Sequence, residues 1–239
     1  MKRIIFGIAA IATLVATPAP AEPQSLPAIP DWNWTGIYLG GNAGYGGTSG
    51  ASTFTINQNG GFSSFPGLNA KGGFGGGQIG VNYQISWLVV GVEADAEAAS
   101  VKDSVNNILG NPNNPALNAS ARVSSFETLR GRVGLAFGQV LVYATGGAAQ
   151  ANIDNFWIIN NAFAAHRSGD VHGSVWGTGM EIGLSKNWPV KLEYQYFHVG
   201  NFSLSAPAPA GPITNTPYTN NFATVRFGLN YRIDWWPGR

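Results

Sequence analysis

The chain has 239 residues, a formal net charge of +1 and 10% charged residues, against about 25% in an ordinary soluble domain. It has no cysteine, which excludes disulfides and thiolate metal sites, and no basic stripe, which argues against nucleic acid as a partner. Glycine, at 33 residues, and an aromatic share of 12% favour strands and turns over helices.

The N-terminus has the pattern of a signal peptide. Lys2 and Arg3 form a positive start, and residues 4–17 form an apolar run that is too short to span a bilayer. Small residues then stand at the positions that a signal peptidase reads, so we expect cleavage between Ala21 and Glu22. A retained signal anchor is the alternative, but anchors usually have a longer apolar run.

Beyond the N-terminus, the apolar residues alternate with a period of two, as they do in strands. Each alternating segment has about ten residues, the length that a tilted strand needs to cross a membrane. The segments cover residues 34–46, 75–85, 88–98, 128–137, 140–150, 176–184, 190–198 and 223–233. Eight is an even number, as a closed antiparallel bacterial barrel requires, so we predict an all-β fold, an eight-stranded antiparallel transmembrane β-barrel.

The links between these segments alternate in length. Short periplasmic turns and long outer loops are typical of outer-membrane barrels. The short links cover residues 86–87, 138–139 and 186–189. The long links are rich in Gly, Asn, Ser and Pro, and they cover residues 46–72, 99–121, 154–171 and 203–221.

One face of each segment is apolar, and that face meets either lipid or an enclosed ligand. The alternation alone also fits a soluble lipocalin-type barrel, whose apolar residues point inward. The tryptophans favour the membrane, because aromatic rings at the two ends of apolar strands form the girdles of a membrane interface. They divide between the periplasmic end (Trp32, Trp34, Trp87, Trp188, Trp235 and Trp236) and the outer end (Trp157 and Trp176). We therefore predict a bacterial outer-membrane location, with Leu135 and Val225 facing lipid.

The opposite, lumen-facing side of the strands carries charges of both signs. Because the lumen of an eight-stranded barrel is just wide enough for side chains, these charges must satisfy one another in place of bulk water. The expected network is Glu93, Asp95, Glu97, Glu181 and Glu193 against Arg130, Arg132, Lys191, Arg226 and Arg232. Segment 88–98 brings only acids and segment 128–137 only bases, so cross-strand pairs are available. A lumenal salt-bridge network is favoured over acid–base catalysis by these carboxylates.

Two further patterns suggest a binding site or a catalytic site, but neither is strong evidence for one. Residues 75–80 match a dinucleotide fingerprint, but no helix follows, and the glycines are better interpreted as room for lumen side chains. His166, His172 and His198 lack a metal-ligand spacing. A lipid-modifying hydrolase that uses His198 is a third alternative, but no acid is placed to orient its imidazole.

The chain resembles the small outer-membrane immunogenic, porin-like barrels of alphaproteobacteria. The resemblance rests on WTGIYLGGNAGYG at residues 34–46, GVEAD at 91–95, RGRVG at 130–134, YATGG at 143–147 and EY at 193–194. It implies an eight-stranded, OmpA-like surface-antigen barrel linked to envelope integrity and host contact, with no catalytic residues to carry over. The chain departs from such barrels, which usually end on an aromatic residue, because Ile233 is followed by six further residues.

These observations lead to a non-enzymatic surface barrel that displays loops and supports the envelope, with a narrow pore for ions or small solutes as the alternative. The expected partners are outer-membrane lipid, the outer-membrane insertion machinery, and host or envelope molecules that contact the loops; no cofactor is expected. The chain then divides into a signal peptide (1–21), a periplasmic segment (22–33), the barrel (34–233) and a C-terminal tail (234–239).

Overall fold

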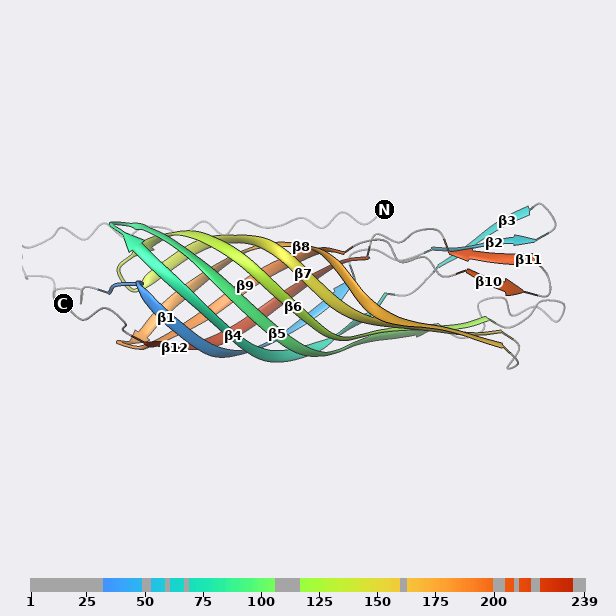
Figure 1. Cartoon of the computed structure of the whole chain (residues 1–239), viewed down its shortest axis with the longest axis horizontal. Helices are drawn as coiled ribbons and strands as arrows, with labels where there is room; N and C mark the ends of the chain where they lie inside the picture. Colours follow the sequence, from blue (N-terminus) through green and yellow to red (C-terminus); the bar gives the residue numbers. More distant parts are fainter. Residues whose placement is uncertain are drawn as a thin grey trace, which may run out of the picture. The chain divides into compact units, whose positions relative to one another are not determined.

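The computed structural model describes residues 32–48, 53–58, 61–66, 69–105, 117–159, 163–199, 205–208, 211–215 and 220–233. Eight antiparallel strands close into a barrel in the order β1-β12-β9-β8-β7-β6-β5-β4 (Figure 1). They are β1 (Gly36–Thr48), β4 (Lys71–Ile85), β5 (Leu88–Val105), β6 (Leu117–Phe137), β7 (Val140–Ile159), β8 (Phe163–Ser185), β9 (Trp188–Val199) and β12 (Asn220–Ile233). The predicted eight-stranded barrel is confirmed. Among the described residues, no helix is long and apolar enough to cross a membrane.

Three tight turns define one end of the barrel, here called the short-turn end. Residues 86–87, 138–139 and 186–187 each join two neighbouring strands. All three were predicted as short links, but the third is shorter than the predicted 186–189 because β9 already begins at Trp188. Ser86 and Gly138 have φ angles of 56° and 61°, the left-handed conformation that two-residue hairpin turns use to match the twist of the strands. The opposite end is called the long-loop end.

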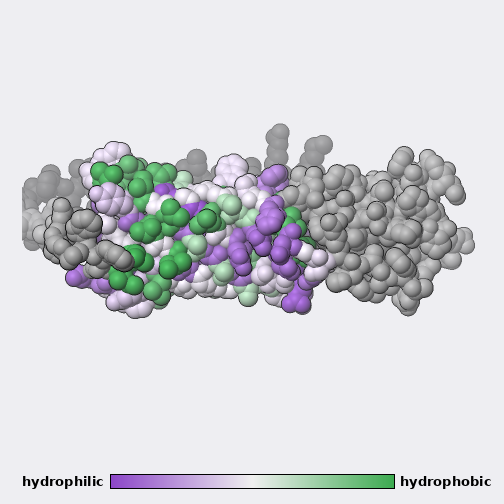
Figure 2. Space-filling model, viewed as in Figure 1, coloured by the Kyte–Doolittle hydropathy of each residue, from purple (hydrophilic) through white to green (hydrophobic). Residues whose placement is uncertain are grey.

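The alternation of side chains produces an apolar exterior over the half of the barrel nearer the short turns. Figure 2 shows hydrophobic residues gathered over this half and hydrophilic residues over the other. Leu135 and Val225 are exposed on the outer face, as predicted. Further exposed apolar residues come from every barrel strand, among them Leu39, Ile79, Val92, Val142, Met180, Leu192 and Phe227. This band is suited to contact with lipid tails.

Toward the long-loop end, the strands are longer than the sequence predicted. β5 and β6 occupy much of the link 99–121, and β7 and β8 occupy most of the link 154–171, so the prediction of loops there was wrong. The physical reason is that the alternation of apolar and polar residues continues, but here the apolar residues point inward and the polar residues point outward. Lys102 and His172 are exposed, whereas Val101 and Ile153 are buried inside. Here the barrel is polar outside and apolar inside, like a soluble protein.

Two of the long links also contain strands. Link 46–72 includes β2 (Thr53–Gln58) and β3 (Gly61–Pro66), and link 203–221 includes β10 (Ser205–Ala208) and β11 (Gly211–Asn215). These four pair into a separate sheet in the order β10-β11-β2-β3. The sequence did not predict these strands because the prediction rested on alternation over about ten residues, and each of these strands has only four to six residues.

The exterior band makes a prediction about charge tolerance. Val133→Arg should lower the free energy of unfolding in lipid vesicles by about 2 to 4 kcal/mol, because Val133 is exposed near the middle of the apolar band and an arginine there would meet the hydrocarbon. Ser168→Arg is the matched control, since Ser168 is exposed on β8 beyond the apolar band, and it should change the stability little. Equal stability of Val133→Arg and the parent would contradict a lipid-facing position.

Candidate functional site: the charged layer of the barrel lumen

Nine of the ten predicted lumen charges lie together in one buried layer of the barrel interior, here called the charged layer. β5 and β6 supply most of it, and β8, β9 and β12 supply the rest. Its members are Glu93, Asp95, Glu97, Arg130, Arg132, Glu181, Lys191, Glu193 and Arg226, each with no more than 6% of its surface exposed. The alternation of each strand points these side chains at one another across the lumen.

Two arginines on separate strands hold the centre of the charged layer. Arg130 binds Glu93, lies 2.6 Å from Asp95 Oδ2 through Nη2, and reaches Glu193 Oε1 at 2.7 Å through Nη1. Arg226 approaches these same three carboxylates from β12, with Nη2 at 2.7 Å from Glu193 Oε1. Each guanidinium therefore bridges several acids, which suits its planar set of five N–H donors.

Glu93 is the carboxylate with the most cationic partners. Lys191 Nζ lies 2.9 Å from Glu93 Oε1 and donates to both carboxylate oxygens. Arg132 Nη1 approaches Glu93 Oε2 at 3.7 Å, while its Nη2 pairs with Glu181 Oε1 at 2.6 Å. A buried carboxylate needs such partners, because it has exchanged its hydration for them.

Neutral groups complete the hydrogen bonding of the acids. Tyr38 donates to Glu93 Oε2 at 2.8 Å, and Tyr143 donates to Glu193 Oε2 at 2.5 Å. Lumen-facing glycines make room for these rings, since a side-chain carbon at Gly80 would collide with Tyr38 and one at Gly179 with Tyr143. The interpretation of Gly80 as space for a lumen side chain is therefore confirmed.

The acids outnumber the bases in the charged layer by five to four, counting Glu93, Asp95, Glu97, Glu181 and Glu193 against Arg130, Arg132, Lys191 and Arg226. The excess lies toward the long-loop end of the layer. Glu97 pairs with Arg226 at 2.9 Å and accepts from Asn42, but its Oε2 accepts no hydrogen bond from the described residues, and neither does Asp95 Oδ1. Within the described ranges, Glu97 thus has one cationic partner and one carboxylate oxygen without a hydrogen bond.

Arg232 is the predicted network residue that the structure places elsewhere. It lies at the short-turn end, where it donates to the backbone carbonyls of Asn33 and Lys186. Its guanidinium also lies 4.7 Å from the ring centroid of Trp32. The alternation of inward and outward side chains along β12 correctly predicted that Arg232 points inward. Alternation gives no information about the position of a side chain along the barrel axis.

Trp32 and Trp34 also differ from their predicted role. They are buried inside the barrel mouth, at 8% and 2% exposure, and do not face lipid. Trp34 donates its indole N–H to the carbonyl of Gly138, which fixes the chain across a turn. Trp32, Trp34, Val89, Ala136, Leu141 and Tyr143 form an apolar inner cluster. Trp87, Trp188 and Trp176 remain exposed, as expected of girdle residues, whereas Trp235 and Trp236 lie outside the described residues.

On the other side of the charged layer, four phenylalanines fill the lumen, and sequence reasoning missed them. Phe197 and Phe222 stack with centroids 4.1 Å apart, and Phe126 meets Phe74 edge-on at 5.1 Å. Each stands four residues from a polar lumen residue: Phe74 from Gln78, Phe126 from Arg130, Phe197 from Glu193 and Phe222 from Arg226. That shared spacing was the available signal. These four residues are called the outer aromatic cluster.

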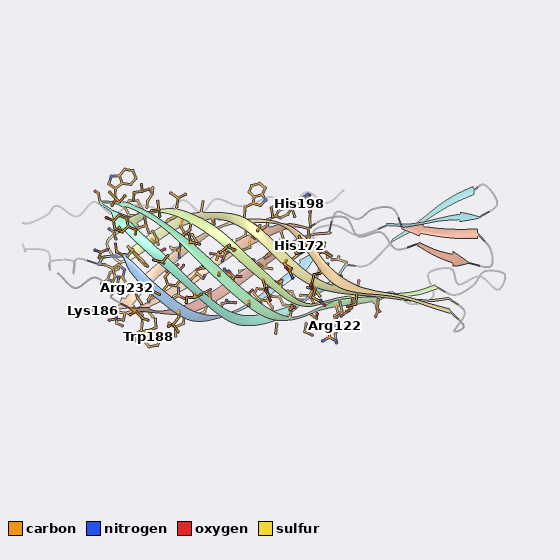
Figure 3. The ribbon with its side chains drawn as sticks, in the orientation of Figure 1. Arg122, His172, Lys186, Trp188, His198 and Arg232 are labelled. Atoms are coloured by element: carbon orange, nitrogen blue, oxygen red, sulfur yellow. The ribbon has the colours of Figure 1, made fainter. Side chains whose placement is uncertain are left out.

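The histidines whose side chains the structure describes lie outside the charged layer. No group of three or more His, Asp or Glu in the described ranges could hold a metal ion. His172 and His198 are exposed near the long-loop end (Figure 3). His198 Nδ1 lies 2.8 Å from the amide oxygen of Asn221, and no described hydrogen bond joins either histidine to a serine. The side chain of His166 lies outside the described part.

An apolar exterior band around an interior filled by charged and aromatic side chains defines a small transmembrane β-barrel. The chain matches the outer membrane protein beta-barrel domain family over residues 7–232, and it belongs to that family. The predicted resemblance and the bacterial outer-membrane location are both confirmed by the comparisons that follow.

Relatives and solved structures agree with this assignment. The chain is 32% identical to the 31 kDa outer-membrane immunogenic protein of Brucella melitensis, over 96% of this chain and 95% of the relative. It is 27% identical to the 25 kDa outer-membrane immunogenic protein of Brucella abortus, over 95% and 92%. The crystal structure of the outer membrane protein OprG from Pseudomonas aeruginosa shares the fold, with a TM-score of 0.55 and 13% identity over 85% of this chain and 99% of that one.

The acids of the charged layer have different numbers of cationic partners, so we expect their replacement by neutral residues to change the stability by different amounts. Glu93→Gln should lower the free energy of unfolding by about 3 to 5 kcal/mol, because the cations that converge on this carboxylate lose their shared partner. Glu97→Gln should cost less than about 1.5 kcal/mol, the scale of one hydrogen bond, because it removes the excess charge of the layer. Urea unfolding in vesicles measures both, and equal losses would contradict the unequal roles.

Proposed function

We propose that the protein is a non-enzymatic structural barrel of the outer membrane, which presents its long-loop end at the cell surface and has a closed lumen. The observation that carries this proposal is the filling of the lumen by three successive layers. The inner cluster, the charged layer and the outer aromatic cluster follow one another along the interior. Arg226, Lys191 and Gln195 have 0% exposure, which supports a lumen without a continuous water path.

The surface role is supported by the relatives and by the length of the strands. Two relatives are named immunogenic proteins of the outer membrane. β6, β7 and β8 have 20 to 23 residues, about twice the 9 to 11 that a membrane crossing needs, so part of each strand stands beyond the bilayer. Host or envelope molecules would meet these extensions and the segments that join them. The insertion machinery and outer-membrane lipid are the partners expected of the barrel itself.

Conductance in planar bilayers tests the closed lumen. The parent should show only rare, small current steps. Arg130→Ala should open more often, because it leaves acids of the charged layer without their partner and favours entry of water. Arg122→Ala is the matched control, since Arg122 is exposed on the outer face of the same strand, and it should behave as the parent does. Large, steady conductance in the parent, unchanged by Arg130→Ala, would favour the narrow-pore alternative.

A further inference from the structure

Three basic side chains stand in a row across three neighbouring strands on the outer face of the barrel. In the strand register, Lys71 of β4 is opposite Lys102 of β5, and Lys102 is opposite Arg122 of β6. All three are exposed, and Arg122 stands off the ribbon in Figure 3. These three residues are called the basic row.

The basic row is not explained by interactions within the described part of the chain. No ion pair or hydrogen bond described there involves these three side chains. Asp154 of β7 is opposite Arg122 and flanks one end of the row, which leaves a net excess of positive charge. Directly opposed like charges destabilise neighbouring strands, so an anion that bridges the row would offset an existing repulsion.

The height of the basic row places it at the membrane surface. Lys71 lies 14 residues from the short-turn end of β4, and Lys102 lies 14 residues from that end of β5. With a rise of about 3.3 Å per residue and a tilt of about 40°, the row stands about 35 Å above the short turns. The apolar band of such barrels is about 25 Å tall. Exposed apolar residues such as Ile85 and Phe137 stand next to the short turns, so the band begins there. With the long-loop end at the cell surface, on which this inference rests, the row lies about 10 Å beyond the hydrocarbon, at the level of outer-leaflet headgroups.

A groove of about 620 Å³ lies on the outer face of the same strands, nearer the short turns. It exists because Gly77, Ala94 and Ala96 are small, while Ile79 and Leu129 wall it. Its volume falls within the range of about 300 to 1,000 Å³ seen for small-molecule sites. The groove has a polar rim on the side of the basic row. It consists of Glu127, Gln150 and His172, which stand opposite one another on neighbouring strands and also line the groove.

We propose that the basic row and the groove together bind one anionic glycolipid of the outer leaflet. The phosphate groups of its sugar headgroup lie on Lys71, Lys102 and Arg122, and the sugar hydroxyls meet the polar rim. An acyl chain lies in the groove, where small residues let it approach the strand backbone. Charged hydrogen bonds at the row supply the headgroup selectivity, and apolar contact in the groove distinguishes a lipid from a soluble anion.

Binding of purified lipid A to the full chain in phosphatidylcholine vesicles tests this inference. The triple variant Lys71→Gln, Lys102→Gln, Arg122→Gln should weaken the apparent Kd by about tenfold or more, because several charge-assisted contacts are lost. Lys186→Gln is the matched control, since it removes one positive charge at the short-turn end and should leave the Kd unchanged. Circular dichroism of each variant in vesicles verifies that the barrel has folded. An unchanged Kd in the folded triple variant would overturn the proposal.

A second variant tests the groove without altering charge. Ala96→Phe should fill it and weaken binding of acylated lipid A, while binding of the deacylated headgroup stays the same. Equal affinity of the parent for phosphatidylglycerol would overturn the glycolipid assignment. Full competition by millimolar inorganic phosphate would show that only an anion is bound, and binding of a sulphated polysaccharide in place of lipid A would identify a soluble polyanion; either result would overturn the lipid proposal.

Discussion

The structure depends on a single electrostatic constraint: nine ionisable side chains are buried together in the lumen, each with no more than 6% of its surface exposed. Ions removed from water are tolerated only when they are paired and hydrogen-bonded. Arg130 and Arg226 meet this demand by bridging the same three carboxylates from nearly opposite positions in the strand order. Because those bridges join strands far apart around the barrel, they fix the cross-section of the lumen as well as its charge.

The other features follow from the position of the charged layer between two apolar ones. The inner cluster and the outer aromatic cluster lie on either side of the ions, and apolar surroundings strengthen the attraction between opposite charges. The outer cluster also accounts for the length of the strands toward the long-loop end. Where Val101 and Ile153 turn inward and Lys102 turns outward, the barrel has its own apolar core and no longer needs lipid to cover its exterior.

The sequence alone predicted the strand number, the lipid-facing side and the lumen side, because a period of two assigns every residue to one of two faces. It did not predict height, since alternation gives no measure of position along the barrel axis. Arg232 was therefore grouped with charges that lie elsewhere, and Trp32 was placed in a girdle although it packs inside the mouth. The strand extensions were not predicted because strands were expected to carry apolar residues on the outer face, and toward the long-loop end the outer face is polar.

The central claim, that the charged layer is shielded from water, is tested most directly by a double-mutant cycle between Arg130 and Glu193, whose Nη1 and Oε1 atoms lie 2.7 Å apart. Unfolding of the parent, Arg130→Met, Glu193→Gln and the double variant in lipid vesicles gives the coupling energy between the two side chains. A shielded pair predicts a coupling above about 1.5 kcal/mol. A coupling below about 0.5 kcal/mol, typical of ion pairs at an exposed surface, would show that water fills the lumen and would contradict the account.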